Sequence, residues 1–91
     1  MSDLPSELEA IGAEARVAVE AAASLEALKE VRVRFLGRRS RLNEILRSVP
    51  TLSDTDKRVV GAAGNRLRQE LGAAVEARRA ALEAQEVERL L

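Results

Sequence analysis

Apolar residues in the middle of this 91-residue chain recur with the spacing of a helix that packs lengthwise against a neighbour. Four of them lie seven residues apart, and two more follow a neighbour by three residues. This is the pattern of the a and d positions of a coiled-coil seam. It predicts a helix over about residues 25–49, which ends before Pro50 because proline cannot continue the hydrogen-bond ladder. The seam residues are Leu28, Val31, Phe35, Leu42, Ile45 and Val49.

A second long helix is predicted over about residues 54–88. Ser53 followed by Asp56 is a typical start signal, and apolar residues then recur at three- and four-residue spacing from Val60 to Leu82. Only the short stretch around residues 48–54 separates the two long helices, so they are expected to lie antiparallel. The predicted fold is therefore all-α, an antiparallel two-helix coiled-coil hairpin.

A shorter N-terminal helix is expected before the hairpin. Ser6 with Glu9 has the spacing of a capping box and predicts a helix over about residues 6–22, and Ser24 is placed to cap the helix that follows. Residues 1–91 are expected to form a single helical domain, since the chain is too short for more than one.

The composition argues against catalysis by this chain. It contains no His and no Cys, so the common zinc ligands and the most frequent general base are missing. Gly61 to Gly64 lacks the Lys and Ser or Thr of a phosphate-binding loop. We expect no metal or other cofactor in this chain. With no signal peptide and no apolar run near the ~20 residues that span a bilayer, the expected location is cytoplasmic, without a membrane partner.

Charge is distributed unevenly along a chain whose formal net charge is zero. Residues 1–30 carry a net charge of −5, residues 31–68 carry +7, and residues 69–91 carry −2. Five arginines fall between Val31 and Arg41 without one acidic residue. A basic band between acidic ends is typical of a surface that binds a polyanion.

On a continuous helix, the seam assigns each arginine of this band a position. Arg34, Arg38 and Arg41 would form one stripe, with Arg38 at a seam position, and Arg32 with Arg39 would lie on the opposite flank. The second long helix would add two more arginines at the same height, Arg66 and Arg68.

The basic residues and the glycines of this region also have purely structural interpretations. Basic residues on helices often pair with acids of a neighbouring helix. The nearest acids are Glu44 and Glu70, and the N-terminal helix could bring Glu7, Glu14 or Glu20 alongside. Gly37 weakens a helix, and this requires a reason such as a close ligand or a local kink. The glycines of the segment 61–64 allow close approach of the facing helix, or merely weaken their own.

The segment Val31-Arg-Val-Arg-Phe-Leu-Gly-Arg-Arg-Ser-Arg-Leu42 resembles the N-terminal region of bacterial phenylalanyl-tRNA synthetase alpha subunits. Gly61-Ala-Ala-Gly-Asn65 and the Ala- and Glu-rich stretch after Ala73 resemble later parts of the same region. The similarity extends over nearly the whole chain. Phe35 replaces a frequent Tyr, and Ser40 stands where the family usually has a second Gly.

The resemblance implies a helical hairpin that projects from a synthetase and contacts the outer corner of tRNA. It places the aminoacylation domain, with ATP and magnesium, farther along the parent chain and absent from these residues. It also implies a beta subunit as partner of the whole protein. The residues expected to meet tRNA are Arg34, Arg38, Arg39 and Arg41, followed by Arg32, Arg66 and Arg68.

An alternative function is a coiled-coil protein–protein interaction module whose basic face binds an acidic partner. A third alternative is self-association of the isolated domain, because removal of a parent body would expose apolar surface that could pair with a second copy.

Overall fold

The computed structural model describes residues 3–91, and every regular element in that part of the chain is helical. The elements are α1 (Leu4–Ala21), α2 (Leu25–Leu36), α3 (Arg41–Ser48), the short 3-10 helix η1 (Val49–Thr51) and α4 (Asp54–Leu90). The expected all-α fold class is therefore confirmed.

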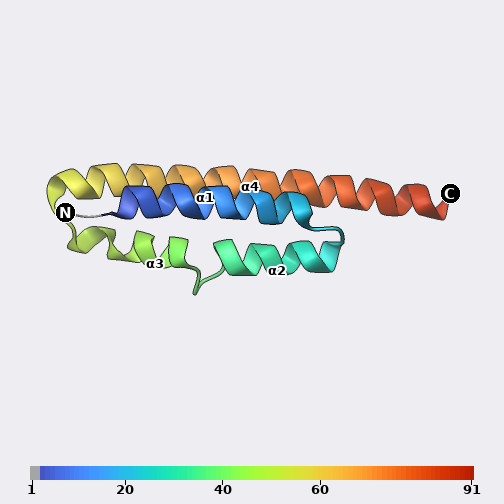
Figure 1. Cartoon of the computed structure of the whole chain (residues 1–91), viewed down its shortest axis with the longest axis horizontal. Helices are drawn as coiled ribbons and strands as arrows, with labels where there is room; N and C mark the ends of the chain where they lie inside the picture. Colours follow the sequence, from blue (N-terminus) through green and yellow to red (C-terminus); the bar gives the residue numbers. More distant parts are fainter. Residues whose placement is uncertain (1–2) are drawn as a thin grey trace.

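The helices form a rod of 56 × 18 × 17 Å around α4, which has 37 residues. Figure 1 shows α1 alongside α4 and running in the same direction, whereas α2 and α3 run the opposite way. The hairpin closes at η1, as the Pro-containing turn predicts. The N-terminal helix α1 is a third member of the bundle, because it packs along both α4 and α2.

Two apolar clusters fill the rod: the first spans the break between α2 and α3, and the second lies between α1, the beginning of α2 and the later part of α4. All four α-helices contribute to the first cluster, so the core does not depend on the hairpin alone. Full burial of a large aliphatic side chain stabilises the fold by about 1.5–3 kcal/mol. The first cluster contains Leu8, Ala15, Phe35, Leu42, Ile45, Val60, Leu67 and Leu71. The second contains Val19, Ala22, Leu28, Val75 and Leu82.

Serine hydroxyls cap three of the four α-helices. Ser24 and Ser53 accept hydrogen bonds from the backbone N–H groups of Ala27 and Asp56, at 3.0 and 3.2 Å, as predicted. The predicted cap at Ser6 is wrong, because α1 begins at Leu4, two residues earlier. Pro5 fits in its first turn, where a missing N–H group leaves no intrahelical bond unmade.

The predicted continuous helix over residues 25–49 is also wrong, because residues 37–40 form a loop between α2 and α3. A Cβ atom at Gly37 would lie only 2.3 Å from the carbonyl oxygen of Val33. The backbone therefore turns here in a way that other residues cannot follow without a shift. The kink is the reason for Gly37, and Arg38 lies in the exposed loop rather than at a seam position.

Close helix packing explains Gly64 but not Gly72. A Cβ atom at Gly64 would approach Cδ2 of Leu46 to 2.6 Å, so the expected close approach of the facing helix occurs here. At Gly61 the nearest atom would be at an ordinary 3.6 Å, on Val49. At Gly72 a Cβ atom would meet nothing within 4 Å.

These surroundings predict opposite effects of two Gly-to-Ala substitutions. Gly37→Ala should lower the free energy of unfolding by about 1–3 kcal/mol, because its Cβ collides with backbone. Gly72→Ala should raise it by about 0.5–1 kcal/mol, because alanine loses less backbone entropy in a helix. Urea unfolding of dilute protein, followed by circular dichroism, measures both. Equal stability of Gly37→Ala and the parent chain would contradict the steric account.

Candidate nucleic-acid interface

Arg34 and Arg41 face α1 and are engaged in ion pairs with its acids. Arg34 contacts Glu14 at 2.5 Å, and its guanidinium carbon lies 4.8 Å from the centre of the adjacent Phe35 ring. Arg41 donates two hydrogen bonds to the carboxylate of Glu7, from Nε to Oε2 and from Nη2 to Oε1, the second at 2.9 Å. For these two arginines, the alternative prediction that basic residues pair with acids of a neighbouring helix is confirmed.

The paired arginines remain partly accessible to a ligand. Side-chain exposure is 64% for Arg34 and 47% for Arg41. Arg41 also contacts Glu44 at 2.6 Å, so two carboxylates compete with any incoming anion. The expected stripe of Arg34, Arg38 and Arg41 does not exist as one helical face, because the helix is interrupted between its members.

Arg38 and Arg39 lie on the α2–α3 loop, residues 37–40, and both are exposed. Figure 1 shows this loop projecting from the rod on the side away from α4. Among residues 3–91, neither guanidinium has a hydrogen-bond or ion-pair partner. Arg38 and Arg39 therefore form an exposed basic site that no acid of the described residues neutralises.

Side chains of α3 hold the backbone of this loop. The Asn43 amide donates to the carbonyl oxygens of Leu36 and Gly37 at 3.1 and 2.7 Å. One turn later, Arg47 donates to the carbonyl oxygen of Arg38 at 2.8 Å. Two side chains thus bond three successive carbonyl groups at and after the end of α2, and the Gly37 carbonyl also accepts from the backbone N–H of Ser40 at 3.1 Å.

The loop ends at Ser40, which is buried and caps α3 by accepting from the Asn43 N–H group at 3.2 Å. Ser40 therefore has a clear structural role at the position where the family usually has Gly. Sequence reasoning missed Ser40, Asn43 and Arg47 as residues that shape the site. The available signal was a glycine followed three residues later by a serine, which is a helix stop followed by a helix cap.

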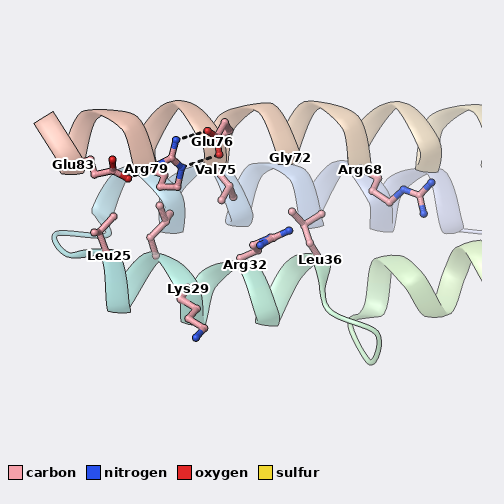
Figure 2. A pocket seen from close by; sticks show the side chains of 11 residues that line it. Leu25, Lys29, Arg32, Leu36, Arg68, Gly72, Val75, Glu76, Arg79 and Glu83 are labelled. Carbon is pink, nitrogen blue, oxygen red and sulfur yellow. Dashed lines mark hydrogen bonds and ion pairs between the residues drawn. The ribbon is translucent and has the colours of Figure 1, made fainter.

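A groove between α2 and α4 holds two more of the expected arginines, Arg32 and Arg68. It encloses about 600 Å³. Figure 2 shows Arg32 extending along the groove and Arg68 at the end nearer the α2–α3 loop, while Lys29 turns away from α4. Neither arginine has an ion-pair partner within 4.0 Å in the described part of the chain. They form a second basic site, which continues toward the loop.

Acidic residues occupy the other end of the α2–α4 groove. Arg79 donates to both carboxylate oxygens of Glu76 and also contacts Glu83. Hydrogen bonding from Arg79 lowers the pKa of Glu76, and the positive charge of Arg32 adds to this effect. Arg66 lies elsewhere, beside a hollow between α1 and α4, so the structure separates it from Arg68.

Residues 3–91 contain no group of three or more acidic, His or Cys side chains placed to hold a metal ion. In the same range, no helix is long and apolar enough to cross a membrane.

Comparison with known proteins places this arrangement in a family. Residues 23–91 match the family described as the N-terminal domain of class II aminoacyl-tRNA synthetases. This match covers more than half of the chain, so the chain belongs to that family.

Three relatives that it resembles carry the name phenylalanine–tRNA ligase alpha subunit. Identity is 38% over 88 residues with that of Bacillus licheniformis, covering 97% of this chain and 26% of the relative. It is 42% over 82 residues with that of Nitratidesulfovibrio vulgaris, covering 90% and 24%. For Nostoc punctiforme it is 34% over 87 residues, covering 96% and 26%. The expected resemblance is confirmed, and the chain spans about a quarter of the length of these ligases.

The pair of Glu7 and Arg41 predicts a dependence of stability on pH. Hydrogen bonding from Arg41 holds the pKa of Glu7 below its ordinary value of 4.5 in the folded chain. The stabilisation is therefore present above pH 4.5 and is lost as the pH falls through the lowered value. Because the pair is exposed, its contribution should not exceed about 1 kcal/mol.

Glu7→Gln tests this dependence by removing the charge while keeping the shape. Urea unfolding should show the variant less stable than the parent chain at about pH 7 and equally stable at about pH 2. A stability difference that is the same at both pH values would refute the electrostatic origin.

The hydrogen bonds from Asn43 predict protection of the α2–α3 loop from proteolysis. Asn43→Ala should speed trypsin cleavage after Arg38 and Arg39 roughly fivefold, which corresponds to about 1 kcal/mol of lost hydrogen bonding. Asn65→Ala is the matched control, because it removes an asparagine that donates to the Gly61 carbonyl oxygen within α4. Equal cleavage rates for the parent chain and Asn43→Ala would show that the amide does not hold the loop.

Proposed function

We propose that this chain is the tRNA-binding helical appendage of a phenylalanine–tRNA ligase alpha subunit. The observation that carries the proposal is the pair Arg38 and Arg39, exposed and without acid partners on a loop fixed by hydrogen bonds. Membership in a synthetase domain family makes tRNA the polyanion that such a site would meet.

The type and placement of the residues favour phosphate contacts. The planar guanidinium group suits phosphate oxygens, and a fixed loop loses less conformational entropy on binding than a mobile one. Arg32 and Arg68 extend the basic surface along the α2–α4 groove. Phosphate contacts of this kind orient an RNA without reading its sequence.

The structure favours a folded RNA over a single strand. Phe35 is the only aromatic residue of the chain and is buried in the core. No aromatic platform is therefore available on which unpaired bases could stack. A rod with a projecting basic loop can follow the shape of a folded RNA along its backbone.

In the whole protein, the appendage would position tRNA for ATP-dependent attachment of phenylalanine. That chemistry would belong to a catalytic domain outside these residues, with magnesium as its metal, and the assembly would include a beta subunit. The contribution of this chain would be affinity and orientation of the RNA.

A double substitution of the loop arginines tests the proposal. Arg38→Ala/Arg39→Ala should weaken binding of phenylalanine tRNA at least tenfold near 0.1 M salt, because each phosphate contact releases counterions. The slope of log affinity against log salt should become shallower by about two. Fluorescence anisotropy over a salt series measures both quantities. Arg41 is left intact, because its pairs with Glu7 and Glu44 support the fold.

Arg16→Ala/Arg89→Ala is the matched control, because it removes the same charge away from the loop. The control should keep a tRNA affinity within a few-fold of the parent chain. Unchanged binding by the loop variant would exclude this site. Failure of the parent chain to bind tRNA, together with retention of an acidic protein, would support the adaptor alternative.

A further inference from the structure

Carboxylates of α1 hold the two arginines that flank the α2–α3 loop. Arg34, near the end of α2, donates to Glu14 at 2.5 Å. Arg41, the first residue of α3, donates two hydrogen bonds to Glu7. The unpaired loop arginines therefore have a further guanidinium group on each side in the sequence, and each of these two groups already contacts an anion.

The four paired side chains line one hollow between α1 and the segment of α2 and α3. The hollow encloses about 360 Å³, and its lining includes both arginines, both glutamates and Phe35. The paired side chains remain accessible, with exposed fractions from 37% for Glu7 to 64% for Arg34. An anion that enters the hollow from solvent can therefore reach both guanidinium groups, but only by competing with a carboxylate at each.

Each glutamate occupies a position that suits a phosphate group. Nε and Nη2 of Arg41 bond both oxygens of Glu7, which is the bidentate geometry that guanidinium also forms with phosphate. Arg34 lies over the Phe35 ring, 4.8 Å from its centre, and this contact orients its guanidinium group. Glu7 and Glu14 are seven residues apart, or about 10 Å along α1. The two carboxylates thus stand in for a pair of phosphates at that spacing.

Tight packing of α1 keeps the two carboxylates in front of the arginines. A Cβ atom at Gly12, which lies between them in the sequence, would be 2.9 Å from Cδ1 of Leu67, so α1 approaches α4 closely there. Beyond the end of α1, Arg78 donates from Nε and Nη2 to the carbonyl oxygen of Ala22 at 3.1 and 2.9 Å. Anions on a docked helix have a high effective concentration and lose little entropy when they pair. They are therefore persistent competitors for the arginines.

We propose that Glu7 and Glu14 are built-in competitors of RNA phosphate, which hold Arg34 and Arg41 until tRNA displaces them. This inference rests on the proposed function, because it names what limits the affinity of the same surface. RNA contacts the unpaired loop arginines first, and its phosphates then exchange with the carboxylates at the flanking arginines. On release, the tethered carboxylates recapture the guanidinium groups. The two acids therefore lower the affinity for tRNA and speed its dissociation.

Glu7→Gln/Glu14→Gln tests the competition by removing both charges while keeping both side-chain shapes. An exposed ion pair is worth up to about fivefold in an equilibrium constant, so this variant should bind tRNA about three- to tenfold more tightly than a matched control. The control is Glu9→Gln/Glu20→Gln, which removes the same charge from exposed positions of α1. Among residues 3–91, neither of these glutamates has an ion-pair partner. Fluorescence anisotropy at one salt concentration measures both dissociation constants.

Equal affinities of the two variants would show that the acids act only through net charge, and would overturn the proposal. Stopped-flow displacement should further show that the gain lies mainly in slower dissociation, since recapture of the arginines is lost. A gain confined to the association rate would indicate general attraction and would contradict the exchange. Circular dichroism should show unchanged helicity in both variants.

A double-mutant cycle locates the competition at one arginine. Glu14→Gln should tighten tRNA binding in the parent chain. In an Arg34→Ala chain it should have no more effect than Glu20→Gln, because no guanidinium group is left for the carboxylate to occupy. An equal gain from Glu14→Gln in both backgrounds would refute the pairing with Arg34 as its cause.

The tRNA affinity of the parent chain separates this inference from the proposed function. If the parent chain binds tRNA and Glu7→Gln/Glu14→Gln binds no more tightly than its control, the competition is wrong and the proposed function stands. If neither the parent chain nor this variant binds tRNA, both are wrong. Binding by the variant alone would support both, because the acids would then mask the site completely.

Discussion

The backbone leaves the helical path at Gly37, where a Cβ atom would collide with the carbonyl oxygen of Val33. Much of the arrangement of the arginines follows from this turn. The backbone turns at Gly37, and α2 ends one residue earlier. The carbonyl oxygens of Leu36, Gly37 and Arg38 then accept hydrogen bonds from the side chains of Asn43 and Arg47. The loop is consequently short and tied to α3. Arg38 and its neighbour extend from a fixed backbone rather than lying on a helix face.

The acids of α1 decide which arginines are available to a ligand. Glu7 and Glu14 lie opposite Arg41 and Arg34, and these four residues neutralise one another at short range. The basic band of the sequence therefore does not produce a uniformly positive rod. Charge without a nearby acid is left on the loop and in the α2–α4 groove, where an anion would not have to displace a carboxylate.

The α2–α4 groove is the second place where basic charge stays available. Arg32 and Arg68 line it without an ion-pair partner among the described residues, and they would extend an RNA-binding surface away from the loop. The loop arginines lie outside the groove, so the two basic sites are separate surfaces of one rod.

The sequence by itself determined the helical class, the hairpin turn at Pro50, two of the serine caps and the burial of Leu28, Phe35, Leu42 and Ile45 on the seam. These properties depend on the spacing of apolar residues and on contacts between residues only a few positions apart in the sequence. Gly37 and Ser40 signal the break after Leu36 locally, but only the structure shows that Asn43 and Arg47 of the following helix hold the loop in place. It also decided which arginines pair with another helix, since the acids that Arg16, Arg34 and Arg41 meet across helices lie 20 to 54 positions away. Helix periodicity places a residue on a face, but the packing of other helices decides what that face meets.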